Sequence, residues 1–100
     1  MGAISNFIFV EYKDKKEVEK TFYQKKAEDE YEYGRNPYSG SFATFEGIKF
    51  TGKSFEYEKE AKDYILDESE KGGDALAVEV KDSHVHYYII GGWCATWKMI

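Results

Sequence analysis

The sequence contains a single cysteine, Cys94, and a single proline, Pro37. One cysteine excludes an internal disulfide and is typical of proteins in a reducing cytoplasm. No apolar run is long enough to cross a membrane, and the first residues have neither the basic start nor the apolar stretch of a signal peptide. From these absences we expect a cytoplasmic protein that neither spans nor binds a membrane.

Arginine is scarce as well, since Arg35 is the only one in the chain. The net charge of the chain is -5. Affinity for DNA or RNA comes largely from neutralising phosphates, so direct binding of nucleic acid is disfavoured. An acidic chain is better suited to bind a protein that itself holds nucleic acid.

The chain contains enough apolar residues to form one hydrophobic core. Of its 100 residues, 42% are hydrophobic and 18% aromatic, which argues against disorder although 33% are charged. This length supports a single domain, residues 1–100, without help from a metal or a disulfide. The sequence has no internal repeat, linker or low-complexity tract.

The most informative stretch covers residues 76–90, where two alternating runs flank Asp82-Ser83. This pattern predicts a β-hairpin with a two-residue loop. The resulting register pairs Val80 with Val85 and gathers the apolar side chains on one face. Glu79, on the other face, then lies opposite His86. We expect the helices to cover the apolar face.

The rest of the chain predicts two helices and several strands. Asp14 and Glu17 have the spacing of a capping box and begin a first helix that ends before Gly34. Ser54 is expected to cap a second helix that ends before Gly72. Residues 6–12 are apolar on both faces, which is typical of a central strand. Further strands are expected at 41–45, 48–51 and 93–100.

These elements predict an α+β fold, a mostly antiparallel sheet with two helices packed on one face, in the order β-α-β-β-α-β-β(-β). The stripe of the first helix is imperfect. Val18 and Phe22 share one side, which Lys25 and Asp29 interrupt. A second stripe, made by Tyr23, Ala27 and Tyr31, is left to face a partner unless the helix bends. In the second helix we expect Tyr57, Ala61, Tyr64 and Ile65 to be buried.

The chain opens with Met-Gly-Ala and continues with Tyr-Glu-Tyr-Gly at 31–34 and Tyr-Ser-Gly-Ser at 38–41. In these features, residues 1–45 resemble small bacteriophage proteins of no assigned activity. The chain departs from that pattern at Lys25, Lys26 and Asp29, where apolar residues are expected. The resemblance implies a phage or prophage origin and a setting in the host-cell cytoplasm. Small acidic phage proteins are often counter-defence factors, but the resemblance implies no chemistry.

Candidate catalytic and metal-binding residues are few. His84, His86 and Cys94 form the only metal-like group, and without a second cysteine the histidines are better explained as cross-strand partners of Lys81 and Glu79. Nothing near Ser39, Ser41 or Cys94 supplies a general base. We therefore predict no catalytic residue, no metal and no cofactor.

The acidic side of the second helix is the candidate partner-binding surface. Its carboxylates recur every three to four residues and form a line about 21 Å long at ~1.5 Å per residue. Such a line can imitate a phosphate backbone and occupy a basic channel on another protein. The alternative is a solvated face that Lys59 and Lys62 partly neutralise. The predicted partner-binding residues are Glu56, Glu60, Asp63, Asp67, Glu70, Tyr38 and Tyr88.

A second candidate site is the loop at 35–41, which offers a cation, an amide, a ring and a hydroxyl from Arg35, Asn36, Tyr38 and Ser39. Such a set suits a nucleotide-like ligand. The sequence thus leaves two hypotheses. The first is a non-enzymatic inhibitor of a host protein, such as a bacterial immune nuclease. The second is a nucleotide-signal sponge, for which we expect a homo-oligomer.

Overall fold

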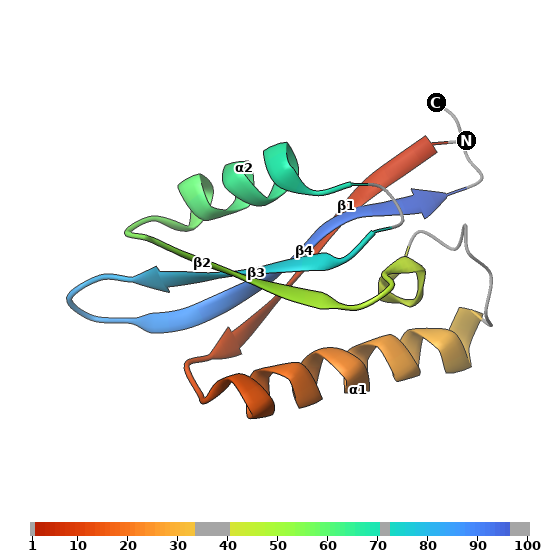
Figure 1. Cartoon of the computed structure of the whole chain (residues 1–100), viewed down its shortest axis with the longest axis horizontal. Helices are drawn as coiled ribbons and strands as arrows, with labels where there is room; N and C mark the ends of the chain where they lie inside the picture. The colour runs from red at the N-terminus through yellow and green to blue at the C-terminus, as the bar shows by residue number, and fades with distance from the viewer. Residues whose placement is uncertain (1, 34–40, 71–72, 97–100) are drawn as a thin grey trace.

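The computed structural model describes residues 2–33, 41–70 and 73–96. Within these ranges, a four-stranded sheet in the order β1-β4-β3-β2 lies between two helices (Figure 1). The β1–β4 and β4–β3 pairs are antiparallel, and only β3 and β2 are parallel. This is the predicted α+β class with a mostly antiparallel sheet. The strands are β1 (Gly2–Glu11), β2 (Ile48–Phe55), β3 (Ala75–Lys81) and β4 (His86–Thr96).

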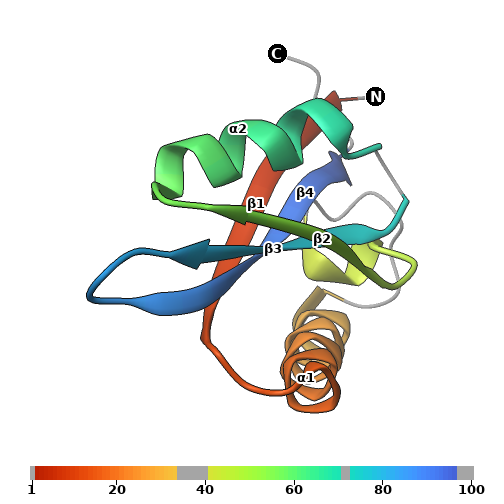
Figure 2. The ribbon, with the colours of Figure 1, turned by 60° about the vertical axis from the view of Figure 1, so that its left-hand side comes forward.

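The helices α1 (Lys15–Tyr33) and α2 (Glu58–Glu68) cover opposite faces of the sheet (Figures 1 and 2). The prediction that both pack on one face is therefore wrong. Ala77 of β3 packs in the core beneath α1, whereas Val78, which points the other way, packs beneath α2. The central strands are apolar on both sides, so each face of the sheet requires a cover.

The hairpin of β3 and β4 has a four-residue loop, 82–85, and not the predicted two-residue loop. Val80 pairs with Tyr87. The Asp82 carboxylate accepts hydrogen bonds from the backbone N–H of His84 (2.6 Å) and of Val85 (2.9 Å), which closes the wider loop and lowers the pKa of Asp82. The register differs from the prediction by two residues, so the side chains within β3 and β4 keep their expected faces. Val85, predicted on the apolar face opposite Val80, instead lies in the loop and is 46% exposed.

β1 is an edge strand, although residues 6–12 predicted a central one. It pairs only with β4 among the described strands. Phe7 packs against the core beneath α2, and Ile8 and Val10 pack on the α1 side. The sequence signal was misleading because a sheet covered on both faces makes even its edge strand apolar on both sides.

α1 begins as predicted, since Asp14 Oδ1 accepts a hydrogen bond from the Glu17 N–H (3.2 Å). Val18 and Phe22 are fully buried. Asp29 is buried as well, and its carboxylate accepts a hydrogen bond from the N–H of Phe42 (2.9 Å). That bond holds the short 3-10 helix η1 (Phe42–Thr44). A strand was predicted at residues 41–45, so this prediction is wrong.

α2 starts later than predicted. Ser54 does not cap it, because Ser54 and Phe55 still pair with β3 as part of β2. Tyr57 is the residue before the helix, and its extended backbone leaves the ring 61% exposed, not buried as predicted. Ala61 and Ile65 are buried as expected.

β4 runs without a break through Gly91 and Gly92, where a bulge or corner was expected before a final strand at 93–100. A Cβ atom on Gly91 would overlap the Asn6 carbonyl oxygen of β1, and one on Gly92 would overlap Ser69 Oγ. The φ of Gly92 is 152°. Close approach of β1 and of the chain after α2 therefore requires glycine here. Residues 97–100 lie outside the described residues.

Candidate functional site

The outer side of α2 carries Glu60, Asp63 and Asp67, all exposed and turned away from the buried Ala61 and Ile65. None of these three carboxylates makes an ion pair with any described residue. Glu56 and Glu70 are exposed too, but they lie before and after the helix. We call these five residues the acidic face.

The strictly helical part of the acidic face is shorter than expected. From Glu60 to Asp67 it extends about 10 Å at ~1.5 Å per residue, where the sequence predicted about 21 Å for the whole set. Lys62 was expected to offset this charge. Its Nζ instead pairs with Glu58 (3.0 Å) and lies over the rings of Phe7 (5.4 Å) and Phe9 (5.2 Å). These contacts direct the charge of Lys62 toward β1. Lys59, the other lysine of α2, makes no ion pair with the acidic face among the described residues.

Of the two tyrosines predicted beside the acidic face, Tyr88 does not lie there. Tyr88 is only 4% exposed and packs on the opposite side of the sheet, under α1, so it cannot act as an exposed anchor. Tyr38 lies outside the described residues. Tyr57, which the sequence pattern predicted to be buried, is exposed at the start of α2 and is the aromatic ring best placed to join the acidic face. Its exposure could have been predicted from the sequence if the end of β2 had been placed at Phe55.

A polar cluster lies on the α1 side of the sheet, near the hairpin loop. His86 Nε2 is 3.0 Å from Glu79 Oε2, and the Tyr88 hydroxyl donates to Glu79 Oε1 (3.3 Å). The ring of Tyr12 stacks on His86 with a 3.7 Å separation of centroids. Burial, followed by the charge of Glu79, raises the pKa of Tyr88.

This cluster satisfies its own hydrogen-bonding groups. The hollow beside it, which Lys15 and Phe50 help to line, measures about 60 Å³. That volume suits one or two water molecules and not a substrate. The predicted partnership of Glu79 with His86 is confirmed, although the strand register places Tyr88 directly opposite Glu79.

The structure does not bring together the three residues of the metal-like group. His84 is exposed in the hairpin loop, and His86 lies eight residues before Cys94 on β4, about 26 Å away at ~3.3 Å per residue. Cys94 is fully buried, and burial raises the pKa of its thiol. Within 2–33, 41–70 and 73–96, no group of three or more His, Cys, Asp and Glu side chains is arranged to hold a metal ion.

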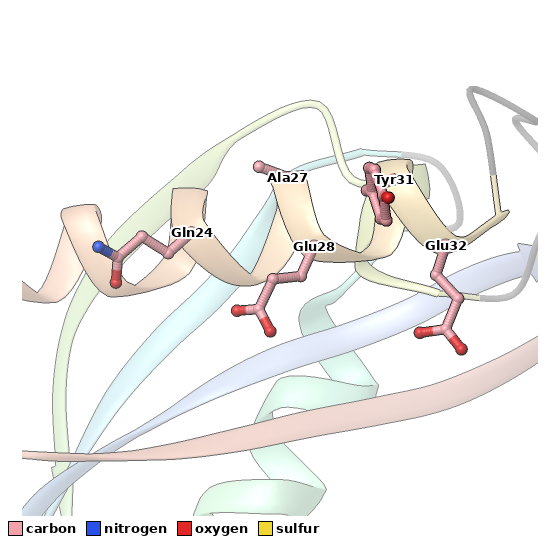
Figure 3. Close-up of a pocket in the computed structure, with 5 residues that line it drawn as sticks. All are labelled: Gln24, Ala27, Glu28, Tyr31 and Glu32. Atoms are coloured by element: carbon pink, nitrogen blue, oxygen red, sulfur yellow. The ribbon is translucent and has the colours of Figure 1, made fainter.

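A hollow of about 660 Å³ lies along the outer side of α1. Glu28 and Glu32 project from the same side of the helix (Figure 3). Tyr31, which belongs to the second stripe, is 95% exposed, so this stripe faces outward and the helix covers the sheet with its Val18 and Phe22 side. The described residues that line the hollow are Gln24, Ala27, Glu28, Tyr31 and Glu32.

The nucleotide-binding alternative falls on Arg35, Asn36, Tyr38 and Ser39, which all lie outside the described residues. Ser41, the next candidate along the chain, is described and has a structural role. Its Oγ accepts a hydrogen bond from the Ala43 N–H (3.3 Å) at the start of η1.

Comparison with known proteins returned no match, since no protein-family model, no curated protein and no solved structure is significantly similar to this chain. In the described ranges, neither helix has the length and apolar character needed to span a lipid bilayer. The function must therefore be argued from the geometry of the chain itself.

Proposed function

We propose that this chain is a small, non-enzymatic binding protein that inserts the acidic face of α2 into a basic, nucleic-acid-binding site on another protein. The observation that supports this best is the exposure of Glu60, Asp63 and Asp67 in a row, with no described cation paired to them. On a solvated surface of no function, lysines on the same helix commonly take up such charge through i, i+4 pairs.

The row also has a useful geometry. The helix rise separates Glu60 from Asp63 by about 4.5 Å and Asp63 from Asp67 by about 6 Å along the axis. Regularly spaced carboxylates on a rigid helix offer a cationic groove the same kind of negative ladder that a nucleic-acid backbone does. Tyr57, exposed at one end of the row, supplies a ring that can anchor the complex.

The partner class that fits this surface is a nucleic-acid-processing protein of the host cell. The resemblance to phage proteins suggests a nuclease of a bacterial immune system as the target and the host cytoplasm as the setting. Occupying the nucleic-acid channel would inhibit such an enzyme without any chemistry on the part of this chain.

Charge reversal tests the proposal. The variant Glu60→Lys/Asp63→Lys/Asp67→Lys should lose the proteins that the wild-type chain captures from a bacterial lysate, because all three predicted contacts become repulsive. Affinity for a captured protein should fall by roughly 100-fold or more, and wild-type binding should weaken as salt rises. Added double-stranded DNA should displace the captured protein.

A matched control is Glu19→Lys/Glu28→Lys/Glu32→Lys, which changes the net charge equally but alters α1 on the other face of the sheet. It should keep its binding. Equal loss in both variants, or capture that neither salt nor DNA disturbs, would rule out the acidic face as the binding surface.

A further inference from the structure

The outer edge of β1 is the longest unpaired edge in the described structure. The strand has ten residues, follows one register with β4 from Gly2 to Glu11, and has no described strand on its other side. Ile4 and Phe9, two of its large apolar side chains, are 46% and 55% exposed. An edge of this length with such side chains is a template for another strand.

The ladder with β4 determines which backbone groups of β1 are free to pair. Hydrogen-bonded and non-bonded positions alternate along an antiparallel pair. The N–H of Tyr12 donates to the His86 carbonyl (3.2 Å), so the even-numbered residues of β1 are the ones bonded to β4. The odd-numbered residues point their N–H and C=O groups outward. These residues are Ala3, Ser5, Phe7, Phe9 and Glu11.

This edge lacks the features that usually prevent strand addition. Residues 2–10 contain no charged residue and no proline, in a chain that is 33% charged. The register with β4 shows no shift that would mark a bulge. Natural edge strands are normally blocked by a lysine, a proline or a bulge, so an unblocked edge implies a strand that binds there.

We propose that the occupant is β1 of a second copy, paired antiparallel about a two-fold axis at Asn6. Because residues 2–10 are neutral, two copies that each carry a net charge of -5 can join here without placing like charges opposite one another. A foreign strand would need to match the edge by chance, whereas the same strand reversed matches it in length and in charge.

The side chains favour this register. It places Phe7 opposite Ser5 and Phe9 opposite Ala3 on the α2 side, so that each ring meets a small residue. On the α1 side it places Ile4 opposite Ile8. The register two residues further along would bring Glu11 opposite Ala3, inside the paired segment, and is disfavoured. A register one residue away is excluded, because outward groups would then face groups already bonded to β4.

The dimer would hold one eight-stranded sheet. A two-fold axis perpendicular to the sheet keeps both copies of α2 on the same face, so the two acidic faces would lie on one side of the dimer. The pairing itself depends only on β1 and stands whether or not the acidic face binds a partner.

Amide hydrogen exchange measured by NMR at low and at high protein concentration tests the pairing residue by residue. The amides of Ala3, Ser5, Phe7 and Phe9 should exchange quickly in dilute solution and become protected at high concentration. The amide of Glu11 should stay unprotected, because it lies beyond the paired segment. Unprotected odd-numbered amides at high concentration, or protection that includes Glu11, would overturn the proposed pairing or its register.

Sedimentation equilibrium of edge variants provides the second test. Phe9→Lys and Ser5→Lys each place a charge on the edge and should weaken dimerisation on the order of tenfold or more. Tyr31→Lys, the control, adds the same charge on the outer side of α1 and should leave the dimer intact. Circular dichroism checks that each variant is folded. A wild-type chain that stays monomeric, or a dimer that both edge variants retain, contradicts the inference.

Discussion

At the scale of single residues, Asp29 shows how a polar side chain can be part of the core. In the sequence pattern, Asp29 interrupts the apolar stripe of α1. In the structure its side chain is 7% exposed, pairs with Lys25 Nζ (3.0 Å) and accepts the backbone N–H of Phe42 (2.9 Å). A buried carboxylate is tolerated when it is paired and hydrogen-bonded. Asp29 therefore ties η1 to α1 and does not weaken the packing.

Asp29→Ala should lower the free energy of unfolding by about 1–3 kcal/mol, because the Phe42 N–H would be left buried without an acceptor. Asp29→Asn should cost less, since the amide oxygen can still accept that bond. Urea denaturation measures both. Asp67→Ala, which removes an exposed carboxylate of the acidic face, should stay within about 0.5 kcal/mol of wild type. Equal effects of Asp29→Ala and Asp67→Ala would contradict this role.

At the scale of elements, β4 is the strand on which the sheet is built. It pairs with β1 on one side and with β3 on the other, and near its end Trp93 Nε1 donates to the Leu66 carbonyl of α2 (2.9 Å). The glycine pair in its middle lets β1 and the chain after α2 approach together. A side chain there would separate elements that are far apart in the sequence.

Gly91→Ala tests this close approach. The added methyl group would overlap the Asn6 carbonyl and Phe7, so the expected loss is about 1–3 kcal/mol or more in the free energy of unfolding. Gly52→Ala is the comparison. Gly52 has a φ of 75°, but a Cβ there would meet no atom within 4 Å, so the cost is the backbone term alone, roughly 1 kcal/mol. Chemical denaturation of the two variants should rank Gly91→Ala as the more destabilised.

At the scale of the whole molecule, the sheet separates two cores. The core under α1 includes Cys94 and Tyr88, and burial raises the pKa of both side chains. The folded state therefore holds these protons more tightly than the unfolded chain does. The stability that these two groups contribute is fully present below their unfolded-state pKa values, about 9 for the thiol and 10 for the phenol. This contribution is lost as the pH rises toward the folded-state pKa values.

Urea unfolding at intervals between pH 8 and pH 11 should consequently show a decline that begins near pH 9. Tyr88→Phe removes one of three groups whose pKa burial raises, Tyr87 being the third, so its decline above pH 10 should be shallower than that of wild type. A stability that is flat over this range, or an unchanged slope in Tyr88→Phe, would show that these groups are not buried as described.

Local patterns in the sequence determined several features of this protein. The alternation in residues 76–90 correctly predicted a hairpin and the faces of the side chains within its two strands, because a two-residue error in register preserves the alternation. The spacing of Asp14 and Glu17 located the start of α1, since capping depends only on neighbouring residues. The spacing of the carboxylates along α2 also predicted an exposed acidic row, because residues three to four apart lie on one side of a helix.

Only the tertiary structure decided how these elements cover one another. Whether two helices share a face of the sheet or take opposite faces depends on which strands lie in its centre, and strand order follows from pairings between distant residues. The edge position of β1, the burial of Asp29 and Tyr88, and the exposure of Tyr57 all follow from that order. No residue carries this information within its own stretch of sequence, because long-range packing sets the burial on each side of a strand.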